Sequence, residues 1–228
     1  MMLPVAILAG GLGTRLHPVT QAIPKALVEV RGEPFLAHQL RLLRARGIER
    51  VVICKGYLGD MIRDFAGDGS AFGLTVSYSD DGPELLGTAG AVRRAIPLLG
   101  AAFFVIYGDS YLPCDYAAVQ KSFLAAGKQA LMTVHRNEGR WDASNVEFAC
   151  GRIVRYDKRV RATAMRHIDY GLGVFRQSAF EGPQTELVAL YQDLLTAGEL
   201  AGFEVTERFY EVGSFDGIRD LETYLEVQ

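Results

Sequence analysis

The first half of the chain alternates between short apolar runs and segments in which apolar residues recur at helical spacing. The runs are rich in Val, Ile, Phe and Tyr and predict strands, whereas the helical spacing predicts helices between them. Repetition of strand, helix and strand at this interval predicts right-handed crossovers and a mostly parallel, doubly wound sheet. The predicted strands are residues 5–8, 51–54, 75–78 and 103–107, and the predicted helices are residues 35–46, 58–65 and 87–96.

The pattern changes beyond a helix predicted at residues 116–126. Short turns then separate four further apolar runs, which indicates a more antiparallel half on the same sheet. Two helices follow, and Ser214 is a suitable N-cap for the last one. Because we find no internal repeat or linker, we predict one α/β domain with a Rossmann-like mixed sheet over residues 1–228. The further strands are residues 130–135, 145–148, 152–157 and 170–175, and the closing helices are residues 185–197 and 215–227.

Composition places the chain among ordinary globular proteins. Of its 228 residues, 49% are hydrophobic and 22% are charged, and the formal net charge is −3. This charge recruits neither nucleic acid nor an acidic membrane surface, so a local cluster of donors must hold any anionic substrate. The scattered Cys54, Cys114 and Cys150 argue for a reducing compartment. No basic leader segment and no apolar run of roughly 18 residues is present, so we expect a cytoplasmic protein without a membrane partner.

A glycine-rich segment, residues 8–16 (LAGGLGTRL), directly follows the first predicted strand, and Lys25 comes shortly after it. Open parallel sheets bind ligands beyond the carboxyl ends of their strands, where this loop is expected. Glycines allow positive φ and let successive N–H groups point into one concavity that suits phosphate oxygens. Arg15 adds a fork that grips two phosphate oxygens, and Lys25 adds a compact charge. A tight turn without a ligand is the structural alternative, which the two basic residues weaken.

Two familiar phosphate-binding motifs fail on detail. A dinucleotide fingerprint needs glycine or alanine at the position of Leu16, and this mismatch counts against an NAD-binding oxidoreductase. A P-loop ends in Gly-Lys-Ser/Thr, whereas the lysine of this chain is displaced to position 25. The loop therefore belongs to neither class.

The loop and the residues after it resemble the signature of sugar-1-phosphate nucleotidyltransferases. The match is long and specific, and the resemblance extends through most of the chain. It implies the fold of nucleotide-diphospho-sugar transferases, without the left-handed β-helix that several relatives append. The matching positions are residues 10–16 (GGLGTRL), Pro18, Thr20, Pro24, Lys25 and residues 32–36 (GEPFL).

The resemblance also implies a role for each part of the loop. The loop would wrap the β- and γ-phosphates of a nucleoside triphosphate. Arg15 would steady the departing pyrophosphate, and Lys25 would bridge the α-phosphate and the incoming sugar phosphate, so both are expected catalytic residues. The nucleotide-binding residues expected in the loop are Leu8, Gly10, Gly11, Gly13 and Thr14.

A buried-looking strand, residues 103–107, leads to Asp109. Mg²⁺ usually takes one or two protein carboxylates besides phosphates and waters, and Asp109 is well placed to supply one. A cap of the next turn is the structural alternative. Tyr111 replaces the second aspartate of the Asp-x-Asp of related sugar transferases, which favours nucleotidyl transfer. The resemblance adds Glu211, which stands where the family has an aspartate, so Asp109 and Glu211 are the expected Mg²⁺ ligands and Asp109 is a third expected catalytic residue. A charge on a surface strand is the structural alternative for Glu211, and Asp216 is then the next candidate ligand.

Residues 86–91 (LGTAGA) open the helix predicted after the third strand. The family's counterpart forms the floor beneath the base and ribose, so Gly87 and Thr88 are expected to bind the nucleotide. The segment resembles the guanylyltransferases more than the thymidylyltransferases, and uridylyltransferases of muramic acid recycling are similar too. A helix start that uses glycine for compactness is the structural alternative for Gly87.

Three places correspond to the family's sugar site. Asn145 stands where the family has a residue over the sugar, and Lys158 stands where a lysine binds the sugar phosphate. Asp169 replaces an asparagine that holds sugar hydroxyls, and Gly171 follows it. Because an ionised carboxylate only accepts hydrogen bonds, Asp169 would select a pair of hydroxyl donors. Solvated strand charges are the alternative for Lys158 and Asp169.

The resemblance thus implies Mg²⁺-dependent transfer of a nucleoside monophosphate, expected from GTP, to a sugar 1-phosphate with release of pyrophosphate. D-glycero-D-manno-heptose 1-phosphate is the first candidate acceptor and mannose 1-phosphate the next, both as precursors of bacterial surface polysaccharide. The alternatives are uridylyl or thymidylyl transfer to another sugar 1-phosphate, or a non-catalytic nucleotide-sugar sensor. Formation of a homodimer is left open.

Overall fold

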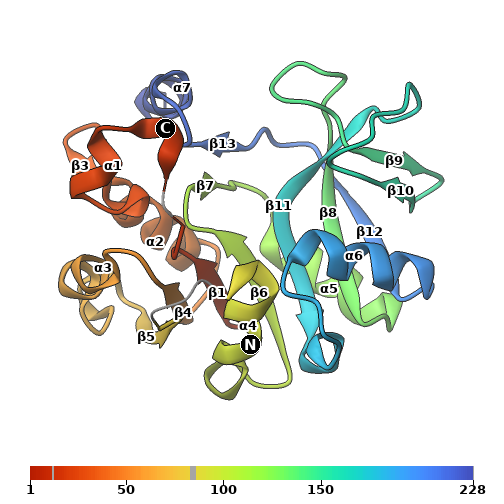
Figure 1. The fold of residues 1–228 in the computed structure, drawn as a ribbon, viewed down its shortest axis with the longest axis horizontal. Coiled ribbons are helices and arrows are strands. Elements are labelled where there is room, and N and C mark those ends of the chain that lie inside the picture. Colours follow the sequence, from red (N-terminus) through yellow and green to blue (C-terminus); the bar gives the residue numbers. More distant parts are fainter. Residues whose placement is uncertain (12, 83–85, 228) are drawn as a thin grey trace.

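The computed structural model describes residues 1–11, 13–82 and 86–227. Within these ranges, one mixed sheet of nine strands carries helices on both of its faces (Figure 1). The strand order along its main path is β10-β9-β11-β6-β1-β4-β5, and β8 and β12 extend the sheet beside β11. This is a Rossmann-like mixed sheet, so the predicted fold class is confirmed.

Four parallel strands form one half of the sheet. β1 lies between β4 and β6, with Ile7 in register with Ile53 on one side and Ile106 on the other, and β5 pairs with β4. The chain passes from β1 to β4 and β5 on one side and returns to β6 on the other, so the strand order reverses at β1. The strands are β1 (Val5–Leu8), β4 (Arg50–Lys55), β5 (Thr75–Asp80) and β6 (Ala102–Tyr107).

Alternate residues of β1 face two different cores. Val5 and Ile7 share a buried cluster with α2, α3 and α5, whereas Ala6 shares one with α4 and α6. This division arises because successive strand side chains point to opposite faces. A third cluster joins α2 to α7 around Leu221. The helices are α1 (Val19–Ala22), α2 (Phe35–Ala45), α3 (Gly59–Ala66), α4 (Gly87–Leu99), α5 (Tyr116–Ala126), α6 (Leu187–Thr196) and α7 (Phe215–Glu226), and the 3-10 turns are Thr14–Leu16, Lys25–Leu27, Ser70–Phe72 and Gln177–Phe180.

The second half of the sheet is antiparallel around the long strand β11, as predicted. β11 pairs with β6 on one side and with β8 on the other. Its pairing with β8 shifts register between Asp169 and Gly173, an irregularity of the kind that re-aims side chains near binding sites. The strands are β8 (Ala130–Arg136), β9 (Val146–Ala149), β10 (Arg152–Tyr156) and β11 (His167–Arg176).

Several strands were not predicted. β12 (Leu200–Val205) pairs parallel with β8 although Gly202 and Glu204 interrupt its apolar run. Two-residue ladders also join β2 to β3 and β7 to β13. Ladders this short carry no periodicity in the sequence, so only tertiary contacts reveal them. They are β2 (Glu29–Val30), β3 (Glu33–Pro34), β7 (Ser110–Tyr111) and β13 (Tyr210–Glu211).

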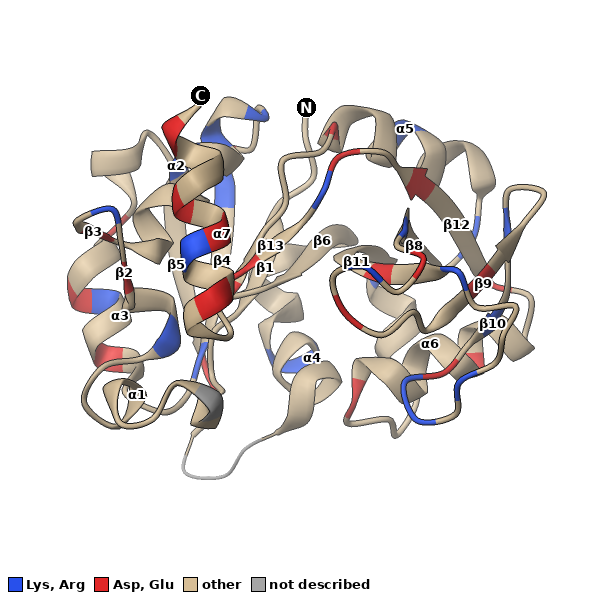
Figure 2. Ribbon diagram, turned by 90° about the horizontal axis from the view of Figure 1, so that it is seen from above, with Lys and Arg blue, Asp and Glu red and all other residues tan. Residues whose placement is uncertain are grey.

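Charged positions are distributed over both halves of the fold. Figure 2 shows Lys and Arg interspersed with Asp and Glu, including along α7. A charge-driven contact with a polyanion would instead need basic side chains gathered on one face. None of the helices in the described ranges is both long enough and apolar enough to cross a membrane.

Candidate active site

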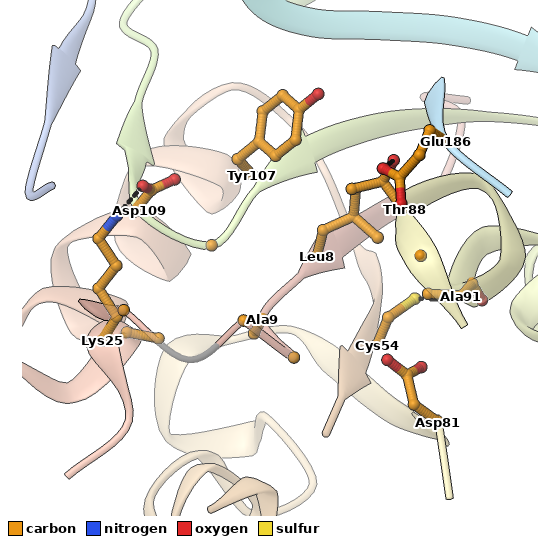
Figure 3. A pocket seen from close by; sticks show the side chains of 16 residues that line it. Leu8, Ala9, Lys25, Cys54, Asp81, Thr88, Ala91, Tyr107, Asp109 and Glu186 are labelled. Carbon is orange, nitrogen blue, oxygen red and sulfur yellow. Dashed lines mark hydrogen bonds and ion pairs between the residues drawn. The ribbon is translucent and has the colours of Figure 1, made fainter. Parts of the chain in front are cut away.

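A cavity of about 320 Å³ opens where β1, β4 and β6 reach their carboxyl ends (Figure 3). The strand order reverses at this point, and open α/β sheets bind their ligands at such a reversal. In Figure 3, Lys25 and Asp109 lie at one end of the cavity, and Asp81 and Cys54 lie at the other. The cavity therefore has two chemically distinct ends.

The glycine loop forms one wall of this cavity. Gly10, Gly11 and Gly13 line it together with Leu8 from the end of β1. Gly13 has φ +62°, a conformation that glycine adopts without strain. A Cβ at Gly10 would lie 2.9 Å from a carboxylate oxygen of Asp81, so a larger residue there would displace that carboxylate. The predicted glycine wall is present, and its contact with phosphate stays a prediction.

The end of the loop is held by a side chain farther along. The Thr20 hydroxyl donates to the Gly13 carbonyl oxygen at 2.8 Å. Thr14 begins the 3-10 turn Thr14–Leu16 and is exposed. Leu12 and the side chain of Arg15 lie outside the described part of the structure, so the predicted contact of Arg15 with pyrophosphate stays a prediction.

Lys25 and Asp109 are 84 positions apart in the sequence, and the fold brings them into an ion pair (Figure 3). Lys25 begins the 3-10 turn Lys25–Leu27, and Asp109 follows β6. Their side chains are only 17% and 20% exposed, so solvent screens the pair less than it would on the surface. A cation and an anion thus stand beside the glycine loop, as phosphoryl-group chemistry with a metal ion requires.

Glu211, the second predicted carboxylate, is brought beside Asp109 by backbone pairing. β13 pairs with β7 so that Glu211 lies opposite Ser110, and the Val212 N–H donates to the Asp109 carbonyl oxygen at 2.9 Å. Carboxylates are hard oxygen ligands, and Mg²⁺ usually takes one or two of them from a protein. In the described ranges, no group of three or more His, Cys, Asp or Glu is arranged to hold a metal. Asp109 and Glu211 supply two such carboxylates, so these two residues fit Mg²⁺ that also binds a phosphate ligand.

Gly87 and Thr88 line the cavity where α4 begins. The Thr185 carbonyl oxygen accepts the Ala89 N–H at 2.8 Å, and the Thr88 hydroxyl donates to the Glu186 carboxylate at 2.9 Å. The start of α4 is therefore tied to the segment before α6. These contacts add Glu186, which no sequence pattern predicted, to the cavity wall.

Gly87→Ala is expected to destabilise the protein and to distort this wall of the cavity. Gly87 has φ +73°, and a Cβ there would lie 2.5 Å from the Thr185 carbonyl oxygen. Strained backbone and collision together should cost on the order of 2 kcal/mol or more. The matched control is Gly127→Ala, because Gly127 also has a positive φ but nothing within 4 Å of an added Cβ. Denaturant titration should show the larger loss of unfolding free energy for Gly87→Ala. Equal losses in the two variants would contradict a close contact between Gly87 and the Thr185 carbonyl oxygen.

Asp81 lines the cavity although no sequence pattern predicted it. Its neighbour Asp80 pairs with Lys55, whereas Asp81 is 6% exposed and its Oδ1 has no partner among the described residues. Burial and the nearby Asp80 charge raise the pKa of Asp81. Buried acceptors are normally satisfied, so this oxygen indicates a place for a donor of the ligand. The sequence offers one signal for Asp81, which is the pair of aspartates at the end of a predicted strand. Successive side chains of a strand point to opposite faces, so two neighbouring aspartates there have different surroundings.

Tyr107 connects the cavity to the predicted sugar residues. It ends β6 and lines the cavity, and burial raises the pKa of its phenol to about 12. The Lys158 Nζ lies 5.7 Å from the centroid of the Tyr107 ring, a cation–π distance. The ring therefore both lines the cavity and contacts a cation of the predicted sugar site.

The four predicted sugar-site residues lie side by side. The Asp169 N–H donates to Asn145 Oδ1 at 2.9 Å, and the Gly171 N–H donates to Asp169 Oδ1 at 3.1 Å. The Lys158 Nζ lies 3.3 Å from Asp169 Oδ2. Burial by itself lowers the pKa of Lys158, but Asp169, Tyr107 and Glu211 together outweigh it, so the pKa is raised. Contact of these residues with a sugar stays a prediction.

Comparison with known protein families identifies the family of this chain. The family model described as nucleotidyl transferase matches residues 5–142, which is more than half of the sequence. The chain belongs to the nucleotidyl transferase family. The match includes the glycine loop, Lys25, the start of α4 and Asp109, which form most of the cavity wall, whereas Glu186 lies outside the match.

Its relatives act on sugar 1-phosphates, as their names state. N-acetylmuramate alpha-1-phosphate uridylyltransferase of Neisseria meningitidis serogroup B is 41% identical over 113 residues, 49% of this chain and 49% of the relative. Mannose-1-phosphate guanylyltransferase catalytic subunit beta of Xenopus tropicalis is 27% identical over 217 residues, 91% of this chain and 60% of the relative. The chain thus spans about half to three fifths of the length of these relatives.

Solved structures share the fold. A putative glucose-1-phosphate thymidylyltransferase from Bacillus anthracis, in complex with a sucrose, has a TM-score of 0.86 at 20% identity, covering 98% of this chain and 95% of that one. HddC from Yersinia pseudotuberculosis complexed with GMP-PN has a TM-score of 0.82 at 24% identity, covering 98% and 100%. At these identities the likeness shows the fold alone.

Proposed function

We propose that the protein transfers a nucleoside monophosphate from a nucleoside triphosphate to a sugar 1-phosphate and releases pyrophosphate. The observation that carries this proposal is that one lysine lies inside the cavity and a second lies over the ring of Tyr107, which lines the same cavity. Lys25 pairs with Asp109 inside the glycine-walled cavity, and Lys158 lies over the Tyr107 ring at the cavity's edge. Two cations at neighbouring places suit two phosphate-bearing substrates that must meet.

In this reaction an oxygen of the sugar phosphate attacks the α-phosphorus in line, and the bond from that phosphorus to the oxygen of the β-phosphate breaks. The nucleophile is already ionised at neutral pH, so no general base is required. Lys25 would neutralise charge at the α-phosphate, and Arg15 would neutralise charge on the departing pyrophosphate. Asp109 and Glu211 would hold Mg²⁺, which supplies further neutralisation of phosphate charge when bound.

The test is a screen of four nucleoside triphosphates against a panel of sugar 1-phosphates, read by pyrophosphate release with and without Mg²⁺. We expect Mg²⁺-dependent release with at least one pair. Binding of nucleotide sugars without turnover anywhere in the panel would instead support a non-catalytic sensor. One domain over residues 1–228 and a cytoplasmic location stay predictions, and formation of a homodimer stays open.

We further propose GTP as the nucleotide, with a manno-configured heptose 1-phosphate or mannose 1-phosphate as acceptor. The resemblance of residues 86–91 to guanylyltransferases supports GTP. So does Asp81, because guanine offers two adjacent donors, N1–H and N2–H₂, to a carboxylate, whereas uracil and thymine offer one. A site that satisfies such an edge rejects bases that leave its acceptor unpaired.

Asp81→Asn is therefore expected to lower kcat/KM for GTP by roughly tenfold or more and to affect UTP less, because an amide replaces one acceptor with a donor. Asp80→Asn is the matched control, since Asp80 pairs with Lys55 and does not line the cavity. The measurement is the ratio of kcat/KM for GTP to that for UTP. An unchanged ratio in Asp81→Asn would remove Asp81 from base selection.

Uridylyl transfer is the second candidate, because 113 residues of the chain, 49% of its length, are 41% identical to a uridylyltransferase. The same screen decides between the two. A kcat/KM that favours UTP with N-acetylmuramic acid 1-phosphate, or dTTP with glucose 1-phosphate, would replace the GTP proposal and leave the reaction class standing.

A further inference from the structure

The Asp169 carboxylate is buried and engaged by protein donors. Its side chain is 4% exposed. Oδ1 accepts the Gly171 N–H at 3.1 Å, while Oδ2 accepts the Tyr156 hydroxyl at 3.1 Å and lies 3.3 Å from the Lys158 Nζ. A carboxylate has about four acceptor positions, and three are directed at these groups. Little of Asp169 is therefore open to a sugar hydroxyl.

We infer that Asp169 is a positioning residue that holds the Lys158 ammonium for the phosphate of the acceptor sugar, and that it does not read sugar hydroxyls itself. This role rests on the proposed function, which assigns Lys158 to that phosphate. It replaces the contact between Asp169 and the sugar that the sequence predicted.

The two residues differ in how firmly the fold holds them. Asp169 belongs to β11, where it lies in register with Val134 of β8, and its N–H donates to Asn145. Lys158 follows β10, and its side chain is 38% exposed. A free lysine side chain carries about 2 kcal/mol of rotamer entropy that ordering must offset. A fixed carboxylate offsets part of it before the substrate arrives.

Two aromatic rings also contact the ammonium of Lys158. The Lys158 Nζ lies 5.7 Å from the centroid of Tyr107 and 6.0 Å from that of Tyr156. Tyr107 lines the nucleotide cavity, and Tyr156 donates its hydroxyl to Asp169. The cation is therefore held against a ring that lines the cavity in which the nucleotide is proposed to bind.

The donors around Asp169 also explain why position 169 holds an aspartate and not an asparagine. In asparagine, an NH₂ group replaces one oxygen. In either orientation this NH₂ would face a donor, which is the Gly171 N–H on one side and the Lys158 and Tyr156 groups on the other. An amide thus leaves a buried donor facing another donor, which is costly. Lys158 needs the carboxylate, whichever sugar is bound.

The test compares the wild-type protein with Asp169→Asn in GTP turnover with mannose 1-phosphate and with glucose 1-phosphate. We expect the KM of both sugar phosphates to rise by about tenfold or more and by similar factors, with the KM of the nucleotide unchanged. Tyr156→Phe should show a smaller rise in the same direction. A loss that differs strongly between the two sugars would instead support direct reading of hydroxyls.

A double-mutant cycle with Lys158→Met separates positioning from a general structural effect. Asp169→Asn should cost little more in the Lys158→Met background, because its effect acts through the missing ammonium. Additive losses would overturn the inference. Thermal melting of all variants reports whether the fold is retained.

A readout without turnover keeps this inference distinct from the proposed function. Acetic anhydride labelling followed by mass spectrometry measures the reactivity of Lys158, with the exposed Lys121 as internal reference. In Asp169→Asn the labelling of Lys158 relative to Lys121 should rise severalfold, and an unchanged ratio would overturn the pairing. A wild-type protein that turns over no sugar phosphate would remove the proposed function while the labelling result still stands.

Discussion

Asp109→Asn is expected to lower turnover by roughly 10² or more while leaving the fold intact. Asparagine has the shape of aspartate, so the backbone contact in which the Asp109 carbonyl oxygen accepts the Val212 N–H should persist. The substitution removes the negative charge that pairs with Lys25 and that, with Glu211, would hold Mg²⁺. Both roles concern charge, and an amide cannot supply it.

The measurement for Asp109→Asn is pyrophosphate release at saturating substrates across a Mg²⁺ titration. Asp64→Asn is a suitable control, since Asp64 is an exposed carboxylate on α3, away from the cavity. A melting temperature close to that of the wild type would exclude unfolding as the cause of lost turnover. Near-normal kcat at saturating Mg²⁺ would remove Asp109 from the proposed metal ligands.

Lys25→Met is expected to lower kcat by roughly 10² to 10³, with a much smaller change in the KM of either substrate. Methionine keeps most of the apolar stem and removes the ammonium. The ammonium lines the cavity beside the glycine loop, where the structure pairs it with Asp109. Negative charge shifts between the two substrates as the α-phosphorus changes partners, so a fixed cation there acts most in the transition state.

Lys121→Met is the matched control for Lys25→Met, since Lys121 is exposed on α5 and should tolerate the change. Steady-state kinetics of both variants separate kcat from KM. If Lys25→Met raised KM alone, Lys25 would bind ground-state phosphate and would have no special part in the transition state. Loss of kcat in Lys121→Met would point to a general effect of removing lysine charge.

The sequence by itself determined the parallel half of the sheet and the cavity wall that it carries. Strands such as β1 and β6 are continuous apolar runs, and the helices between them repeat at 3.6 residues, so local periodicity suffices to predict them. The glycine loop is likewise one unbroken segment directly after a strand. Residues such as Lys25 and Asp109 could be predicted because each lies next to such an element.

Only the tertiary structure decided which of these residues meet. The pairing of β7 with β13, which brings Glu211 beside Asp109, is a two-residue ladder with no pattern of its own. Asp80 pairs with Lys55, 25 positions away in the chain, whereas Asp81 lines the cavity and its Oδ1 has no partner among the described residues. Contacts between residues distant in the chain determine which side chains meet in the cavity. Hydrophobic periodicity cannot predict them, because it depends only on residues close together in the sequence.

Asp169 shows the same limit most clearly. The resemblance of the sequence predicts that Asp169 faces a sugar, and hydroxyl donors of that sugar would then account for its charge. In the fold, Lys158 from the loop after β10 and Tyr156 from β10 direct their donors at its carboxylate. The residue type was visible in the sequence, but the partner that determines its chemistry was visible only in three dimensions, because burial and hydrogen bonding depend on which strands lie side by side.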